Sequence, residues 1–75
     1  MDGTAKTLFI CGKELSLGDF VEVEYTSGTR MKGGRIKGKI TELWSPDLDK
    51  HYQARVESGW CFHDGDLILQ HTPKL

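Results

Sequence analysis

The sequence is poor in residues that mark several classes of protein. Its 75 residues include only 2 cysteines, which is too few for a disulfide framework and fits a reducing compartment. Its apolar runs are only a few residues long, and the opening MDGT lacks the basic start of a secretory signal. We therefore expect one cytoplasmic domain without a membrane anchor.

The chain also lacks a large excess of charge of either sign. Its 10 Lys and Arg nearly balance 11 Asp and Glu, so the net charge does not steer the whole molecule toward nucleic acid or an acidic membrane. The distribution is uneven, because residues 30–40, RMKGGRIKGKI, hold five cations and no acid. The rest of the chain then carries 10 − 5 = 5 cations against 11 acids. Any electrostatic contact must therefore be local.

A helical period is absent as well, and apolar residues instead alternate along short runs such as FVEVEY and RIKGKITELW. Turn residues separate these runs, and Gly38 predicts a bend or bulge within one of them. The predicted strands cover about 7–10, 14–17, 20–25, 35–44, 51–58 and 67–71. Five or six short strands predict an all-β barrel or a tightly rolled sheet.

The alternation also predicts which side chains form the core. On the apolar faces of the strands lie Val21, Val23, Ile40, Val56 and Leu69, whereas Gln53 is predicted to point outward. We expect a flexible N-terminus at 1–6, a single domain at 7–71 and a short tail at 72–75.

The phrase LGDFVEVEY, followed by GKITEL, resembles the KOW motif of SH3-like barrels in ribosomal proteins and transcription elongation factors. Gly18-Asp19 opens the first strand, and Gly38, Ile40 and Leu43 follow a G-x-I-x-x-L pattern. The resemblance covers roughly residues 17–70, although the segment at 26–34 is longer than usual and an extra hairpin precedes it. It implies a small SH3-like barrel of five or six antiparallel strands that contacts nucleic acid or a nucleoprotein.

A second resemblance concerns GKELSLGDFVEV, which is similar to short uncharacterised proteins of phages and other mobile elements. It implies an accessory protein that acts on a host or phage macromolecule.

The basic stretch has two interpretations. In an extended strand, Arg35, Lys37 and Lys39 project from one face about 6.6 Å apart, so they could follow a phosphate backbone. Alternatively, cations on an edge strand prevent pairing with another sheet. Arg30 and Lys32 lie in the glycine-rich loop 26–34, which needs no such protection and is predicted to be the least ordered internal segment.

The aromatic residues are predicted to be mainly core, including Tyr25, Tyr52 and one of Trp60 and Phe62. Trp44 is the exception, because it ends a strand beside Ser45-Pro46. We predict that it is half exposed and available to stack on a base or to fill a partner's pocket. The predicted nucleic-acid-binding residues are therefore Arg30, Lys32, Arg35, Lys37, Lys39 and Trp44.

Cys61 and His63 lie on one face of a predicted strand, and Cys11 and His51 could complete a Cys₂His₂ site. The sequence has no C-x-x-C pair to cluster such ligands, and no glycine elbow accompanies Cys61 as a nucleophile. We interpret Cys61 as a buried, inert thiol, and we expect no metal, no cofactor and no catalysis.

The leading hypothesis is a noncatalytic barrel whose 26–39 face contacts nucleic acid or a nucleoprotein. The alternative is a protein-binding adaptor or inhibitor that uses Trp44 and an acidic surface of Glu22, Glu24, Glu42, Asp47 and Asp49. A small enzyme with a site between subunits is a third class, and the oligomeric state is left open.

Overall fold

The computed structural model describes residues 4–26, 33–45, 47–48 and 50–74. Within these ranges the chain has no helix, and therefore none long and apolar enough to cross a membrane. The described residues form seven strands: β1 (Thr7–Ile10), β2 (Lys13–Ser16), β3 (Phe20–Glu24), β4 (Arg35–Leu43), β5 (Ala54–Val56), β6 (Cys61–Phe62) and β7 (Leu67–Thr72). The predicted all-β class is confirmed, with one more short strand than expected.

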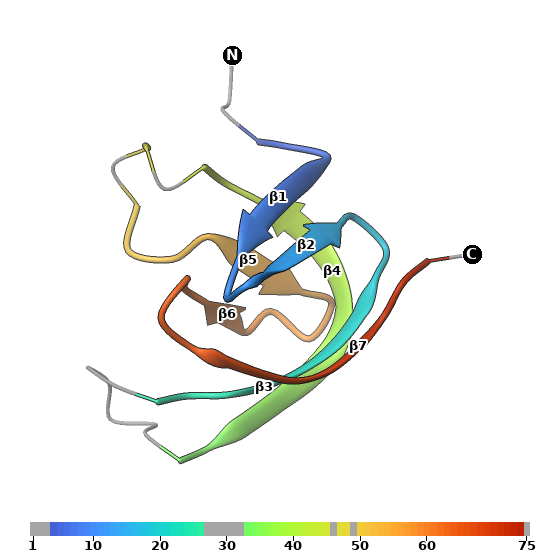
Figure 1. Cartoon of the computed structure of the whole chain (residues 1–75), viewed down its shortest axis with the longest axis vertical. Helices are drawn as coiled ribbons and strands as arrows, with labels where there is room; N and C mark the ends of the chain where they lie inside the picture. Colours follow the sequence, from blue (N-terminus) through green and yellow to red (C-terminus); the bar gives the residue numbers. More distant parts are fainter. Residues whose placement is uncertain (1–3, 27–32, 46, 49, 75) are drawn as a thin grey trace.

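The strands form two antiparallel sheets (Figure 1). One is the β1–β2 hairpin, and the other has five strands in the order β6-β5-β4-β3-β7. The chain before β1 joins the end of β4, where the Ala5 N–H donates to the Leu43 carbonyl at 2.8 Å. No closed barrel is detected among the described strands.

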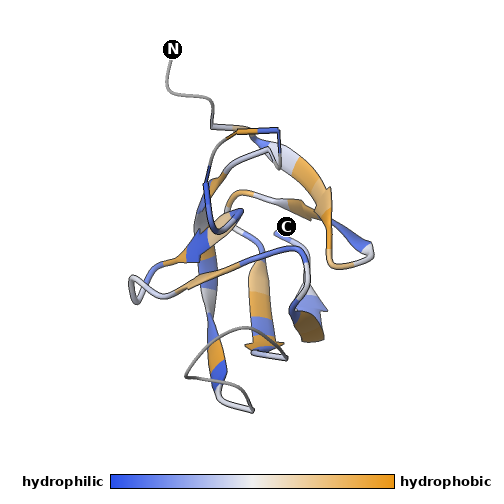
Figure 2. Cartoon of the chain, turned by 90° about the vertical axis from the view of Figure 1, so that its left-hand side faces the viewer, coloured by the Kyte–Doolittle hydropathy of each residue, from blue (hydrophilic) through white to orange (hydrophobic). Residues whose placement is uncertain are grey.

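The predicted alternation holds in β3 and β4, where hydrophobic and hydrophilic residues succeed one another (Figure 2). Val23 pairs with Ile36 on the buried face, while Glu22 pairs with Lys37 on the other. Gly38 lies opposite Val21, and a Cβ atom there would lie 3.4 Å from the Val56 Cβ. An added methyl group would thus already be in van der Waals contact with β5, which shows how closely β4 and β5 approach at Gly38.

The core is shared by both sheets, because the hairpin adds Ile10 and Leu15 to the side chains of the larger sheet. The buried cluster comprises Ile10, Leu15, Val21, Val23, Tyr25, Ile36, Ile40, Leu43, Ala54, Val56, Phe62 and Ile68. Four of the five predicted core residues are present in it. Phe62 is buried and Trp60 exposed, as expected for one member of that pair.

The prediction for Leu69 is wrong, since this side chain is 40% exposed and Ile68 is buried instead. The cause is a register shift between β3 and β7: Glu22 pairs with Gln70, but Val23 pairs with Ile68. Leu69 is thus an extra residue with no partner in β3. Such a bulge breaks the alternation on which the prediction depended.

The outward placement of Gln53 is also wrong. β5 begins only at Ala54, so Gln53 does not follow the strand alternation. Its side chain is buried, and its Oε1 accepts a hydrogen bond from the Asp64 N–H at 2.9 Å. The shortness of β5 also leaves Tyr52, predicted inside, outside the strand and partly exposed.

Most of the 26–34 loop lies outside the described residues, so its predicted disorder stays a prediction. Its two ends are joined, because the Tyr25 N–H donates to the Gly34 carbonyl at 2.9 Å and the Gly33 N–H donates back to the Tyr25 carbonyl at 2.7 Å.

Candidate functional site

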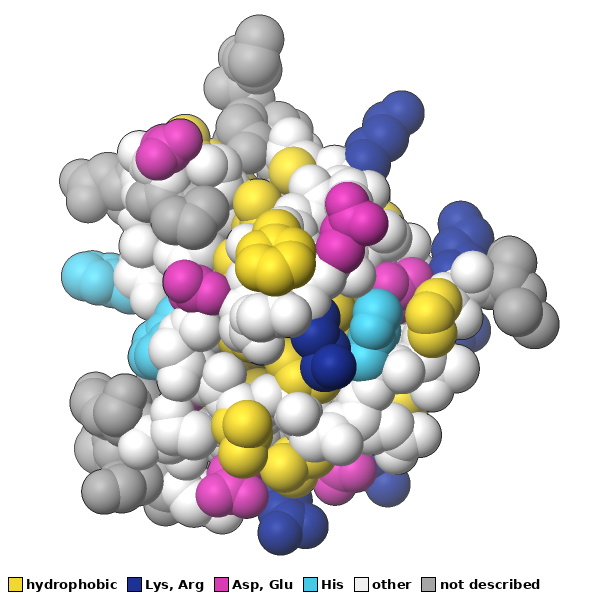
Figure 3. All heavy atoms as spheres, viewed as in Figure 1, with side chains coloured by type: hydrophobic (Ala, Val, Ile, Leu, Met, Phe, Trp, Pro, Cys, Tyr) yellow, Lys and Arg dark blue, Asp and Glu magenta, His cyan; other side chains and the backbone are white. Residues whose placement is uncertain are grey.

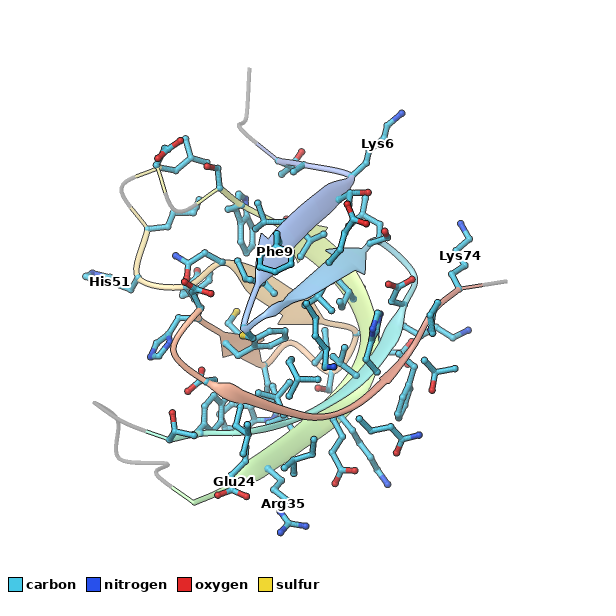
Figure 4. The ribbon with its side chains drawn as sticks, in the orientation of Figure 1. Lys6, Phe9, Glu24, Arg35, His51 and Lys74 are labelled. Atoms are coloured by element: carbon cyan, nitrogen blue, oxygen red, sulfur yellow. The ribbon has the colours of Figure 1, made fainter. Side chains whose placement is uncertain are left out.

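The predicted cation row lies on the exposed face of β4. Arg35, Lys37 and Lys39 all point away from the core, whereas Arg30 and Lys32 lie outside the described residues. The row faces acids on the neighbouring strand: Glu24 is opposite Arg35, and Glu22 is opposite Lys37. Arg35 Nε lies 3.6 Å from Glu24 Oε1. Figure 4 shows the two side chains next to each other, where β3 ends and β4 begins.

This pairing changes how the row is interpreted. Three cations against two glutamates leave 3 − 2 = +1 on this part of the sheet. β4 pairs with β3 along Arg35–Lys39 and with β5 from Ile40 onward. Edge protection could therefore act only on its first half, on the side away from β3. Cross-strand charge pairing accounts for Arg35 and Lys37 more directly.

The predicted exposure of Trp44 is wrong, because the side chain is 5% exposed. Its ring meets that of Tyr52 edge-on at 5.4 Å, and Lys50 Nζ lies 4.8 Å from the ring centroid. A β-bridge to Thr4 brings the chain before β1 against this position. Because its side chain is buried, Trp44 is removed from the candidate nucleic-acid and protein sites. The bridge to Thr4 joins distant segments of the chain, and sequence order could not show it.

The acidic residues of the alternative hypothesis are also partly neutralised by neighbouring arginines. Glu24 pairs with Arg35, and Glu42 Oε1 accepts a hydrogen bond from Arg55 Nη1 at 2.8 Å. Asp49 lies outside the described residues. These acids therefore do not form one uncompensated surface.

The candidate metal ligands do not converge. The described residues contain no group of three or more His, Cys, Asp and Glu side chains that could hold a metal ion. His51 points outward in Figure 4, and Cys61 is partly exposed, which corrects its predicted burial. The Cys11 thiol donates instead to the His63 carbonyl at 3.3 Å.

Cys11 is expected to react slowly with thiol reagents. Burial, followed by the charges of Asp64 and Asp66, raises the pKa of its thiol to about 12, so little reactive thiolate is present at neutral pH. In the Cys61→Ser variant, iodoacetamide should modify the remaining thiol much more slowly in the folded than in the urea-unfolded protein. Mass spectrometry over time measures both rates, and equal rates would contradict the prediction.

A different cluster stands out in the structure, at the turn between β2 and β3. The Asp19 carboxylate has a side-chain exposure of 5% and binds groups from three parts of the chain. His71 Nε2 lies 2.8 Å from its Oδ2, which also accepts from the Ser16 N–H at 3.0 Å. Its Oδ1 accepts from the Lys74 N–H at 2.8 Å. Asp19 therefore ties the end of β2 to β7 and the segment after it.

A pocket of about 490 Å³ opens beside this cluster. It lies between the β2 side of the hairpin and the end of β7, and it combines apolar and charged walls. Its lining residues are Glu14, Ser16, Leu17, Asp19, His71, Pro73 and Lys74. The sequence did not predict this site, because Asp19 was interpreted only as the opening of a strand and His71 only as the end of one.

Phe9 lies across the hairpin from one wall of this pocket. It is 70% exposed on β1 and pairs with Glu14, one of the pocket residues. Its position over β1 in Figure 4 coincides with a hydrophobic side chain open to solvent in Figure 3. Strand alternation along Leu8, Phe9 and Ile10 could have indicated that the Phe9 side chain points outward. The continuous apolar run TLFI obscured this alternation.

Comparison with protein-family models, curated proteins and solved structures finds no match to this chain. The KOW-like and mobile-element resemblances therefore stay predictions, and the site is interpreted from its own geometry.

The Asp19 contacts should make stability sensitive to acid. Burial by itself raises the pKa of Asp19, but the hydrogen bonds from His71 and from the Lys74 and Ser16 amides outweigh it and lower the pKa below its usual value. A lowered folded-state pKa means that the unfolded chain takes up the proton more readily. The stabilisation is complete above the unfolded pKa of about 3.9 and is lost as pH falls through the folded value.

Urea unfolding of the wild type and of Asp19→Asn over a pH series tests this. We expect the difference in their free energies of unfolding to be constant near neutrality and to narrow below about pH 4. If the difference in free energy of unfolding did not change with pH, the charge of Asp19 would not contribute to stability.

Proposed function

We propose that this domain is a noncatalytic module that binds a partner protein through the Phe9 face. We define this face as Phe9, Glu14 and the adjoining pocket. The exposure of Phe9 is the single observation that carries the proposal. Burying such a side chain is worth roughly 1.5–3 kcal/mol, and a domain of this size has little apolar surface to spare for purposes other than folding.

The surroundings of Phe9 support the same conclusion. Protein interfaces centre on aromatic anchors beside well-packed hollows with a polar rim. Here Glu14, the strand partner of Phe9, lines a pocket that also has Leu17 and Pro73 in its walls and Lys74 as a second charged group. Acidic, basic and histidine side chains surround this region in Figure 3.

The Asp19–His71 pair fits a positioning role better than catalysis. Both carboxylate oxygens of Asp19 also accept backbone N–H groups. The pair therefore holds the walls of the pocket together, which gives the Phe9 face a fixed shape before a partner arrives.

The experiment is a pull-down from nuclease-treated lysate with wild-type protein, Phe9→Ser and the control Lys37→Gln. We expect one partner to survive nuclease and the control substitution and to be lost with Phe9→Ser. With that partner purified, Phe9→Ser should weaken binding by at least about tenfold, as for a hot-spot residue. Equal binding by Phe9→Ser would contradict the proposal.

A second candidate function is nucleic-acid binding, favoured by the one-sided exposure of Arg35, Lys37 and Lys39. If they grip phosphate, affinity should fall with salt at a log–log slope of about −0.9 per duplex phosphate neutralised, or about −0.7 on single strands. Replacing all three by Gln should weaken binding to every sequence and flatten the slope. Absence of binding to labelled oligonucleotides at low salt removes this candidate.

A further inference from the structure

The outer edge of β7 is the longest open strand edge of the larger sheet. β7 pairs with β3 on one side, and among the described residues no strand pairs with its other side. The opposite edge of the sheet is β6, which has only two residues. Beside the last residues of β7 lies the pocket of about 490 Å³, not another strand. Unpaired N–H and C=O groups along such an edge can pair with another chain.

The composition of β7 does not prevent that pairing. Its sequence, LILQHT, contains no Lys, Arg, Asp, Glu, Pro or Gly, which are residues that commonly disfavour edge-to-edge association. Leu67 is 50% exposed and Leu69 40% exposed, so the strand also presents apolar side chains to solvent. The β1–β2 hairpin differs, because Lys13 and Glu14 place charges at exposed positions of β2.

The order of buried and exposed residues indicates which chain fits the edge. Along β7 the side chains at Ile68 and His71 point inward, and the other four point outward. This order is the same when the strand is read from either end. Two antiparallel copies centred between Leu69 and Gln70 therefore pair Leu67 with Thr72, Ile68 with His71, and Leu69 with Gln70. Every inward residue then faces an inward residue, as the pleat of an antiparallel pair requires.

We infer that β7 is a self-complementary edge through which two copies of this chain form a two-fold symmetric dimer with a continuous sheet. Such an interface is isologous, because the same strand is presented by both copies. The dimer contact shares His71 with the pocket of the Phe9 face. Leu67 and Leu69 lie outside that face, so substitutions there test the dimer separately from partner binding at Phe9.

Sedimentation velocity over a wide range of protein concentration tests the inference. The mass of the wild type should rise from 8.5 kDa toward twice that value as concentration increases. Leu69→Lys brings two ammonium groups close to the symmetry axis and should raise the dimer Kd by about tenfold or more. The control Phe9→Lys adds the same charge at a more exposed apolar position on β1 and should leave the dimer Kd unchanged.

A mixed sample of isotope-labelled and unlabelled protein tests the register, through intermolecular NOEs between Ile68 of one copy and His71 of the other. Circular dichroism verifies that each variant is folded, and Leu67→Lys replaces Leu69→Lys if the latter is not. A wild type that stays monomeric at all concentrations, or a dimer that neither β7 substitution weakens, would overturn the inference.

Discussion

Val23→Asp is expected to abolish the folded state. Val23 is fully buried in the middle of β3, opposite Ile36 on one side and Ile68 on the other. Even a protonated carboxyl costs roughly 2–7 kcal/mol when buried without a hydrogen bond, and the apolar contribution of Val adds roughly 1.5–3 kcal/mol. The total is comparable with the roughly 4–11 kcal/mol of stability typical for a chain of this length.

Circular dichroism and thermal unfolding measure this outcome, with Leu69→Asp as the matched control. That substitution adds the same carboxylate to a position that the alternation predicts to be buried and the structure shows to be exposed. We expect Leu69→Asp to retain a cooperative transition near that of the wild type. If Leu69→Asp were unfolded as well, Leu69 would point inward, as the alternation predicts. A stably folded Val23→Asp would show that Val23 does not lie in the core.

Asp19→Ala should have the next largest effect, a loss of about 3 kcal/mol in the free energy of unfolding. Hydrogen bonds to a charged acceptor contribute about 1.5–3 kcal/mol each, though not additively. The substitution removes the acceptor of the Ser16 amide, the Lys74 amide and His71 together. It should also free the segment after β7 from the β2–β3 turn.

Urea denaturation quantifies the loss, and Glu14→Ala is its control. Glu14 lines the same pocket but is exposed, so its removal should change stability by less than about 0.5 kcal/mol. Amide hydrogen exchange supplies a second measurement, since Asp19→Ala should accelerate exchange at Ser16 and Lys74 in particular. Similar stability losses in the two variants would contradict a special role for Asp19.

Local alternation was sufficient to predict much of this fold. In β3 and β4 the apolar residues recur at every second position, and a strand with one buried face has only one phase that hides them. That is why Val21, Val23 and Ile40 were placed correctly and why the cations of β4 were expected on one exposed face. The hairpin around Cys11 and Gly12 could likewise be predicted, because a turn separates two short strand-like runs.

The errors lie where one strand's environment depends on another. Leu69 is exposed because β7 gains a residue relative to β3, and a bulge belongs to a pair of strands, not to one sequence. Trp44 is buried because the chain before β1 bridges to the end of β4, a contact between segments forty residues apart. Burial of Gln53 has the same origin, since its partner is the backbone of Asp64.

The candidate site shows this division most clearly. The sequence by itself determined an all-β chain, its core strands and a row of cations, because charge and alternation are local properties. Only the tertiary structure decided that glutamates of β3 face those cations and that Asp19 of the β2–β3 turn bonds to His71, 52 residues away. It also decided that the strand partner of Phe9 lines a pocket. Each of these depends on strand order and register, which arise when the sheets pack and their side chains meet across the core.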